Sequence, residues 1–181
     1  ARLELGPGDR ALALSSMGFD LSVYDVFGLL AVGGAVVVLP HASRRDPAEW
    51  GRLCHAHRVT IWNSVPALAE MMVEHAEQSG EAFPALRWVL MSGDWIPTDL
   101  PPRLERLVPD AALLSLGGAT EGAIWSICHP ITAAEPDWTS VPYGRPMDNQ
   151  HMHVLNTAGQ PCPEWVVGEL YIGGAGVARG Y

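Results

Sequence analysis

The stretch Ala111-Ala-Leu-Leu-Ser-Leu-Gly-Gly-Ala-Thr-Glu121 leads from an apolar run into a glycine-rich turn that carries a hydroxyl and a carboxylate. Residues 111–116 have the composition of a buried β-strand. Successive backbone N–H groups in such a turn form a concavity for an anion, the Thr120 hydroxyl adds a donor, and Glu121 suits the Mg²⁺ that accompanies a phosphate. The residues alone leave a second interpretation open, a plain strand-end turn in which Thr120 acts as a cap.

Apolar runs of the same kind recur upstream and alternate with amphipathic helical patterns. One helix is predicted to begin at Asp46-Pro47, with an N-cap followed by proline at the first helical position, and another at Ser64-x-Pro66, ending near Gln78. This alternation predicts an α/β fold with a mostly parallel sheet, buried on both faces and flanked by helices. The predicted strands are residues 11–14, 35–39, 59–62 and 86–91.

From Pro130 onward the composition shifts to proline, glycine, aspartate and asparagine, with short strand patterns at residues 153–155 and 169–172. We therefore expect a boundary near Ala134, with residues 1–133 forming an α/β subdomain and residues 134–181 beginning a small, β-rich, barrel-like lobe. The run Gly173-Gly-Ala-Gly176 follows a strand but precedes no helix, so it favours a tight turn over a dinucleotide-binding fingerprint.

Charge and composition exclude several classes of function. The formal net charge of -9 leaves no basic patch for a polyphosphate backbone, so nucleic-acid binding is not expected. No apolar run approaches the roughly 20 residues that span a bilayer, so no membrane association is expected. The three cysteines are scattered, as is typical of reduced thiols in a cytoplasmic protein, and His55 and His57 are interpreted as surface residues, not as a metal site.

The segment Phe19-Asp-Leu-Ser22 places an acid at the start of an apolar helical pattern over residues 23–30, next to an expected strand end. Open α/β sheets bind ligands at the carboxyl ends of their strands. The Asp20 side chain is therefore either a helix N-cap or a partner for a bound cation.

These segments, taken in order, resemble successive core motifs of the adenylation domains of nonribosomal peptide synthetases. The resemblance implies a two-step ligase that joins an amino acid to ATP, releases pyrophosphate, and passes the aminoacyl group to the phosphopantetheine thiol of a carrier protein beside a condensation or heterocyclisation domain. The family's phosphate loop would precede Ala1, and its ribose-binding motif and lysine-bearing lobe would follow Tyr181. The matching motifs are Phe19-Asp-Leu-Ser22, Ser115-Leu-Gly-Gly-Ala-Thr-Glu121, Gly144-Arg-Pro-Met147 and Gly168-Glu-Leu-Tyr-Ile-Gly-Gly-Ala-Gly-Val-Ala-Arg-Gly-Tyr181.

By this likeness Thr120 contacts the α-phosphate and Glu121 coordinates Mg²⁺. Gly93, Gly118 and the backbone from Ser115 to Gly117 border the nucleotide. The sequence departs from the family's usual Asn-x-Tyr-Gly-Pro-Thr-Glu pattern, because serine replaces asparagine at 115, glycine replaces the adenine-stacking tyrosine at 117, and alanine replaces proline at 119. Position 117 thus offers no aromatic ring.

The resemblance also implies a substrate pocket at fixed spacing from these motifs, and its residues are similar to those of cysteine-activating domains that feed thiazoline formation. Asp20 would pair with the α-ammonium group of the amino acid. The mostly apolar walls suit a thiol, which behaves as a small hydrophobe with a weak donor, and Asn63 and Ser92 would meet it. The full set is Asp20, Leu21, Tyr24, Asn63, Leu90, Ser92, Leu116, Ile124 and Trp125.

Two alternatives stay open at this stage. A related acyl- or aryl-CoA ligase would share most of the motifs, but the Asp20 carboxylate would repel a substrate that carries only a carboxylate. A degenerate adenylation fold that serves as a scaffold would fit the departures at 115, 117 and 119, whereas the intact Thr120–Glu121 pair favours an enzyme.

Overall fold

A computed structural model describes residues 3–132 and 137–180 of the chain. The predicted boundary near Ala134 falls outside these residues. In chain order the elements are β1 (Arg10–Ala13), α1 (Leu21–Val23), η1 (Tyr24–Gly28), β2 (Ala35–Val38), η2 (His41–Ser43), α2 (Pro47–His57), β3 (Ile61–Ser64), α3 (Pro66–Ser79), β4 (Trp88–Met91), α4 (Leu100–Leu107), β5 (Ala112–Gly117), η3 (Thr120–Gly122), β6 (Ile127–Ile131), β7 (Arg145–Pro146), β8 (Gln150–Leu155) and β9 (Glu169–Gly174).

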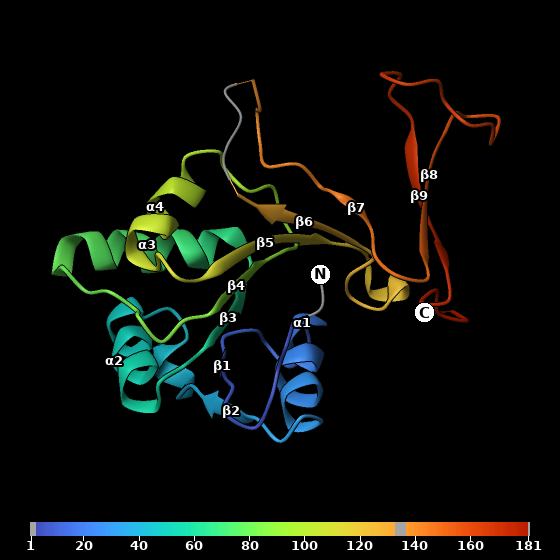
Figure 1. The fold of residues 1–181 in the computed structure, drawn as a ribbon. Helices are drawn as coiled ribbons and strands as arrows, with labels where there is room; N and C mark the ends of the chain where they lie inside the picture. The colour runs from blue at the N-terminus through green and yellow to red at the C-terminus, as the bar shows by residue number, and fades with distance from the viewer. Residues whose placement is uncertain (1–2, 133–136, 181) are drawn as a thin grey trace.

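Seven strands form one sheet in the order β2-β1-β3-β4-β5-β6-β7 (Figure 1). The first five run parallel, while β6 pairs antiparallel with β5 and β7 antiparallel with β6. The predicted α/β class with a mostly parallel sheet is confirmed. Strands β8 and β9 form a separate antiparallel pair that projects from the sheet as an arm (Figure 1).

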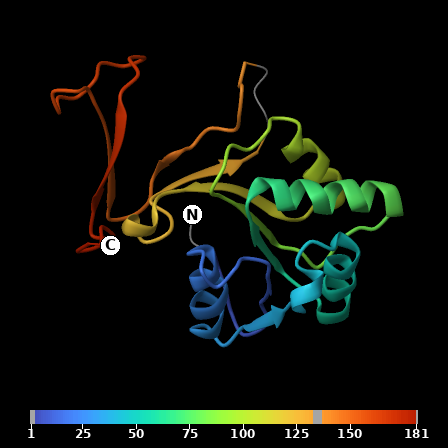
Figure 2. The same ribbon diagram turned by 180° about the vertical axis from the view of Figure 1, so that it is seen from behind.

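The two faces of the sheet carry separate apolar clusters, as the two-residue period of a strand requires. In β4, Val89 and Met91 belong to a large cluster that includes residues of α2, α3 and α4, whereas Leu90 belongs to a smaller one with Leu114 and Leu116 of β5. The helix of α1 and η1 lies apart from α2 and α3 when the molecule is seen from behind (Figure 2). Tyr24 of η1 and Leu29, which directly follows η1, pack in the smaller cluster.

Local rules explain most element starts, with one correction. Asp46 caps α2 as predicted, its Oδ1 accepting from the N–H groups of Ala48 and Glu49. The second predicted helix is confirmed as α3, which begins at Pro66, while Ser64 ends β3 and its Oγ accepts from Trp62 Nε1 at 2.8 Å. The apolar helix expected at residues 23–30 is instead largely a π-helical turn, in which Gly28 has no side chain and so leaves room for the Tyr24 ring.

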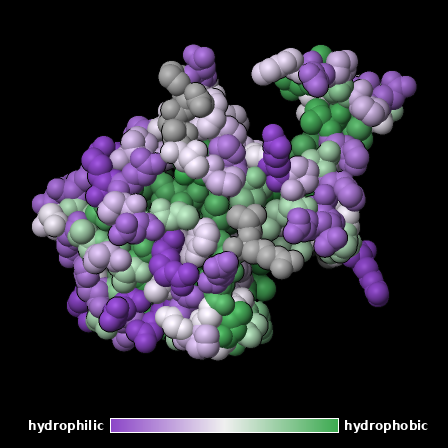
Figure 3. Space-filling view, in the orientation of Figure 1, coloured by the Kyte–Doolittle hydropathy of each residue, from purple (hydrophilic) through white to green (hydrophobic). Residues whose placement is uncertain are grey.

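The β8–β9 arm follows the sequence prediction for residues 153–155 and 169–172. At the far end of β9, Gly174 has φ 113° and a turn at residues 175–176 follows, so the glycine-rich run ends the strand in a turn, with no helix after it among the described residues. Apolar side chains gather on this arm (Figure 3), and Val154, Val166, Val167 and Leu170 are exposed there. The edge strand β7 of the large sheet also comes from the segment after residue 134.

Candidate functional site

The smaller apolar cluster brings four of the nine predicted pocket residues together. Leu90, Leu116, Tyr24 and Trp125 all pack in it, and Asn63 lies two residues after Ile61, on the same face of β3. The rings of Tyr24 and Trp125 lie 4.8 Å apart between centroids, and Trp125 Nε1 donates to Ser92 Oγ at 3.0 Å. These residues come from five separate segments, so the fold assembles a group that the sequence only spaces apart.

Asp25 is a member of this group that the sequence analysis missed. Its side chain is 1 % exposed, and its Oδ1 accepts from Asn63 Nδ2 at 2.8 Å. Burial raises the pKa of Asp25 to about 7, and the hydrogen bond from Asn63 opposes part of that rise. The available signal was an acid inside an otherwise apolar helical pattern, Val23-Tyr-Asp-Val-Phe27.

The same group contains buried polar atoms whose hydrogen-bonding capacity is unused. Within the described residues, Asn63 Oδ1, Asp25 Oδ2 and the Tyr24 hydroxyl are buried without a hydrogen-bond partner. Burial is the main cause that raises the pKa of Tyr24, and the negative charge of the neighbouring Asp25 raises it further. The Tyr24 hydroxyl therefore stays protonated. Unmatched polar atoms beside an apolar wall are suited to a small ligand that carries both kinds of group.

Asp20 lies at the N-terminus of α1, but it does not act as a cap. Its side chain makes no capping hydrogen bond, and Asp20 Oδ2 instead accepts from Thr120 Oγ1 at 2.8 Å. The interpretation of Asp20 as an N-cap is therefore wrong, and so is the interpretation of Thr120 as the cap of a turn, because both side chains face each other. One contact thus joins two motifs that are 100 residues apart in the sequence.

The loop after β5 folds back tightly on its own glycines. Ala123 and Ile124 both have positive φ, at 62° and 69°, which is costly for a β-branched residue. A Cβ on Gly118 would lie 2.5 Å from the Ile124 carbonyl oxygen, so only glycine fits at that position. The loop is held from the other side because the Glu121 carbonyl oxygen accepts from the Ala178 N–H at 2.7 Å.

Glu121 presents a free carboxylate at this loop. Its side chain is exposed, and it makes no hydrogen bond or ion pair with any residue in 3–132 or 137–180. No group of three or more metal-ligating side chains occurs in those residues. A single carboxylate fits Mg²⁺, which is usually bound by one or two carboxylates together with substrate phosphates.

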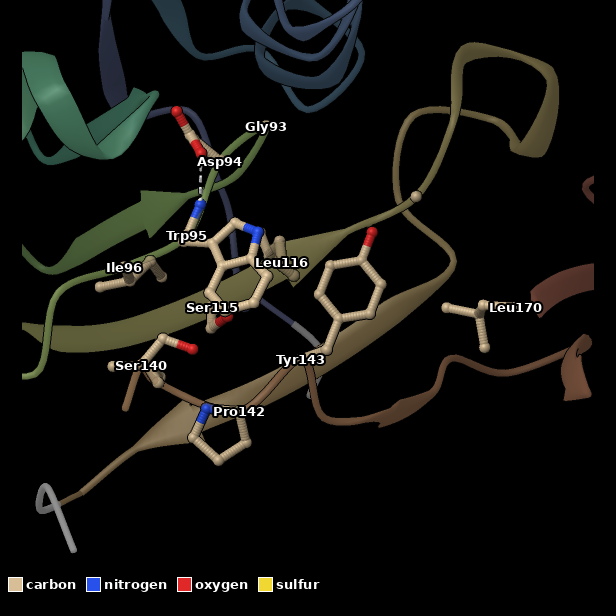
Figure 4. Close-up of a pocket in the computed structure, with 12 residues that line it drawn as sticks. Gly93, Asp94, Trp95, Ile96, Ser115, Leu116, Ser140, Pro142, Tyr143 and Leu170 are labelled. Carbon is tan, nitrogen blue, oxygen red and sulfur yellow. Dashed lines mark hydrogen bonds between the residues drawn. The ribbon is translucent and has the colours of Figure 1, made fainter. Parts of the chain in front are cut away.

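An open pocket of about 600 Å³ lies beside this loop (Figure 4). Of the residues predicted to border a nucleotide, Gly93, Ser115 and Gly118 line it, together with Leu116. The remaining walls include two aromatic residues that the sequence analysis missed, Trp95 and Tyr143. Figure 4 shows both rings facing the hollow over β5, with Leu170 on the far side of Tyr143.

Other sequence features do not form a site. The exposed His55 stacks on Phe83, with ring centroids 5.3 Å apart, and His57 is also exposed, as predicted. All three cysteines are free, and burial raises the pKa of the Cys54 thiol to about 12. Among the described residues, no helix has both the length and the apolar character that crossing a bilayer demands.

The chain is similar in sequence to a known family and to known proteins. The sequence model of the family described as "AMP-binding enzyme" matches residues 1–181. Pyochelin synthetase PchF of Pseudomonas aeruginosa is 48 % identical over 99 % of this chain, and the anguibactin system regulator of Vibrio anguillarum is 46 % identical over 99 % of it. The chain spans only 10 % and 17 % of the lengths of these two relatives, respectively.

Solved structures of other proteins share the fold of this chain. The nonribosomal peptide synthetase FmoA3, bound to AMPPNP, superposes with a TM-score of 0.95 at 46 % identity, covering 99 % of this chain and 20 % of that one. A second FmoA3 structure holds α-methyl-L-serine-AMP and also has a TM-score of 0.95. The Vibrio cholerae adenylation domain AlmE, in complex with glycyl-adenosine-5′-phosphate, has a TM-score of 0.83 at 30 % identity, covering 98 % of this chain and 34 % of that one.

Proposed function

The chain belongs to the AMP-binding enzyme family, and from that premise we propose that it forms the amino-acid- and nucleotide-binding core of an adenylation domain in a nonribosomal peptide synthetase. Residues 1–133 would be the α/β subdomain of that domain, and residues 134–181 the beginning of its β-rich subdomain. The separation of β8 and β9 from the large sheet supports this division, although β7 at Arg145–Pro146 still pairs with β6 of the large sheet.

The observation that carries the proposal is the hydrogen bond between Asp20 and Thr120. In the proposed reaction, a carboxylate oxygen of the amino acid attacks the α-phosphorus of ATP, and the bond from that phosphorus to the pyrophosphate oxygen breaks. The α-ammonium and α-carboxylate groups share one carbon, so the partner of the ammonium must lie beside the partner of the α-phosphate. Asp20 and Thr120 meet this requirement, with Asp20 releasing Thr120 as the ammonium group binds.

The surrounding residues supply the remaining requirements of this step. Gly93, Ser115, Leu116 and Gly118 line the pocket that we assign to the nucleotide, and Glu121 would hold Mg²⁺ against the phosphates. Such an ion neutralises charge that develops on the phosphate oxygens. The aminoacyl group would then pass to the phosphopantetheine thiol of a carrier protein, with a condensation or heterocyclisation domain as the neighbouring partner.

We further propose L-cysteine as the amino acid. Leu21, Leu90, Leu116, Ile124 and Trp125 would surround the side chain, and three of them, Leu90, Leu116 and Trp125, belong to the smaller apolar cluster. The unpartnered Asn63 Oδ1 is an acceptor for the weak S–H donor, whereas Ser92 Oγ already accepts from Trp125. The α-methyl-L-serine adenylate of FmoA3 supports a small side chain with a heteroatom on the β-carbon, and cysteine has sulfur at that position.

Amino-acid-dependent exchange of pyrophosphate into ATP, measured for each amino acid with the complete adenylation domain, tests this function. Cysteine should give the fastest exchange. Serine should be the leading minor substrate, because an apolar pocket discriminates against an isostere by only about 10². Preference for a large or aromatic amino acid would refute the pocket assignment while keeping the family. Exchange with acyl or aryl acids in place of amino acids would favour the CoA-ligase alternative. The absence of exchange with every substrate would favour the scaffold alternative.

A further inference from the structure

Gly117 leaves a space that another part of the chain fills. A Cβ atom placed on Gly117 would overlap Cε2 and Cζ of Tyr143, and it would lie 2.6 Å from the Tyr143 hydroxyl. The tyrosine ring therefore lies directly against the backbone of β5. A larger side chain at position 117 would have to displace the Tyr143 ring, which occupies that room.

The backbone holds Tyr143 in this place from both sides. Two residues earlier, Val141 is buried and its N–H donates to the Ile96 carbonyl oxygen at 3.0 Å. One residue later, Gly144 has φ 105°, and a Cβ there would overlap the carbonyl group of Cys128. The chain then enters β7, which pairs with β6. Such anchoring fixes the backbone from which the ring extends.

The ring also remains accessible from the pocket. Tyr143 is 46 % exposed and lines the pocket of about 600 Å³ together with Gly93, Ser115 and Gly118. Trp95, at 77 % exposed, is the other aromatic wall, but it stands more freely in solvent than Tyr143 does. A fixed aromatic ring with an open side, bordering a pocket of this size, is suited to a flat heteroaromatic ligand.

We propose that Tyr143 supplies the aromatic face on which the adenine ring of the nucleotide stacks, in place of a side chain at position 117. This inference rests on the proposed adenylation function. The sequence alone indicates that position 117 offers no aromatic ring to the nucleotide. The ring comes instead from Tyr143, 26 residues later in the chain. Tyr143 and Gly117 thus act as a matched pair.

Direct binding of ATP, AMP and inorganic tripolyphosphate to the complete adenylation domain separates stacking from phosphate binding. Tyr143→Ala should weaken ATP and AMP binding by about ten- to a hundredfold, the range measured for base–aromatic stacking, and leave tripolyphosphate binding unchanged. Tyr143→Phe, which keeps the ring, should bind all three as the unchanged domain does. Trp95→Ala should weaken ATP binding by less than Tyr143→Ala.

A reciprocal exchange tests the matched pair. Gly117→Tyr alone should lose ATP binding because two rings then compete for one place, and the double change Gly117→Tyr with Tyr143→Ala should bind at least tenfold more tightly than Gly117→Tyr alone. Melting temperatures identify any variant that fails to fold. In that case ATP binding is compared between Tyr143→Phe and Tyr143→Leu, because leucine keeps the bulk of the side chain without an aromatic face. Equal losses of ATP and tripolyphosphate, or unchanged ATP binding in Tyr143→Ala, would overturn the inference. If the variants give either of these results while the unchanged domain still activates amino acids, the proposed function stands and only the stacking role of Tyr143 is lost. If the unchanged domain binds no ATP, both the proposed function and this inference are refuted.

Discussion

The two ends of the parallel strands are built differently. Where the strands begin, Asp9 is 2 % exposed and both of its oxygens are used: Oδ1 accepts from Thr60 Oγ1 at 2.7 Å and from Arg87 Nη1 at 2.8 Å, and Oδ2 from the Gly6 N–H at 2.9 Å. Asp9, Thr60 and Arg87 directly precede β1, β3 and β4, respectively. Where the strands end, Asp20 has the Thr120 hydroxyl as partner in a partly exposed position. The starting edge holds the sheet together, and the finishing edge is available to ligands.

The largest expected effect is at the finishing edge. Asp20→Asn keeps the size of the side chain but removes its charge, so under the proposed function the ammonium group of every amino acid would lose its partner, at a cost of about 3–5 kcal/mol once the bound substrate buries the pair. The kcat/KM of pyrophosphate exchange should fall by at least about a hundredfold for cysteine and serine alike, with little change in the free energy of unfolding. Asp110→Asn, which removes an exposed carboxylate elsewhere, is the matched control. A normal rate in Asp20→Asn would contradict the assignment of Asp20.

At the starting edge the effect should fall on stability. Asp9→Asn removes a buried charge from three hydrogen bonds, and the free energy of unfolding, measured with urea, should drop by about 2–3 kcal/mol because Arg87 stays half exposed and can be solvated. The KM values for ATP and cysteine should stay within about twofold at a temperature where the variant is folded. A tenfold change in either KM without a loss of stability would remove the distinction between the two edges.

The smallest expected effect is on the pH dependence of stability and concerns Asp25, whose Oδ1 accepts from Asn63 Nδ2 of β3. Its pKa of about 7, against an ordinary 3.8, means that the folded chain holds this proton more tightly than the unfolded chain does. The stabilising effect of the proton is therefore full below about pH 4 and is lost as the pH rises through 7. Asp25→Asn has no such titration, so its free energy of unfolding relative to the unchanged chain should rise by about 2 kcal/mol between pH 5 and 8. Parallel stability curves for the two chains would show that Asp25 titrates normally.

These two edges also explain what the sequence could reveal. Strands β4 and β5 were predictable because they are largely buried and mostly apolar. Strand β3, by contrast, lies at Ile61–Ser64, two residues later than the apolar run at 59–62 indicated, because its buried second half carries Asn63 and Ser64. Strand β6 was not predictable, because it is a partly exposed antiparallel strand that contains Cys128, His129 and Pro130. Its pairing with β5 depends on the loop at residues 118–126, which no short-range pattern encodes.

Within the candidate site, the motif residues were predictable and their contacts were not. Asp20 and Thr120 lie in recognisable motifs, but their hydrogen bond spans 100 residues and replaces the capping roles that local rules favour. Tyr143 belongs to no chemical motif, and its importance is visible only in the space above Gly117. The signal in the sequence was indirect: a glycine stands where the resemblance expects a ring, and an aromatic residue directly precedes the Gly144-Arg-Pro motif.

Hydrogen exchange with and without a nonhydrolysable cysteinyl-adenylate analogue, the sulfamoyl adenosine, tests the division between the two edges most directly. This one molecule would fill the amino-acid pocket and the nucleotide pocket together. Backbone amides in residues 92–95, 115–125 and 141–143 should gain protection in the complete adenylation domain, while those in residues 8–10, 59–61 and 86–88 should exchange as before. Protection at the starting edge, or none in residues 115–125 at saturating analogue, would contradict the account.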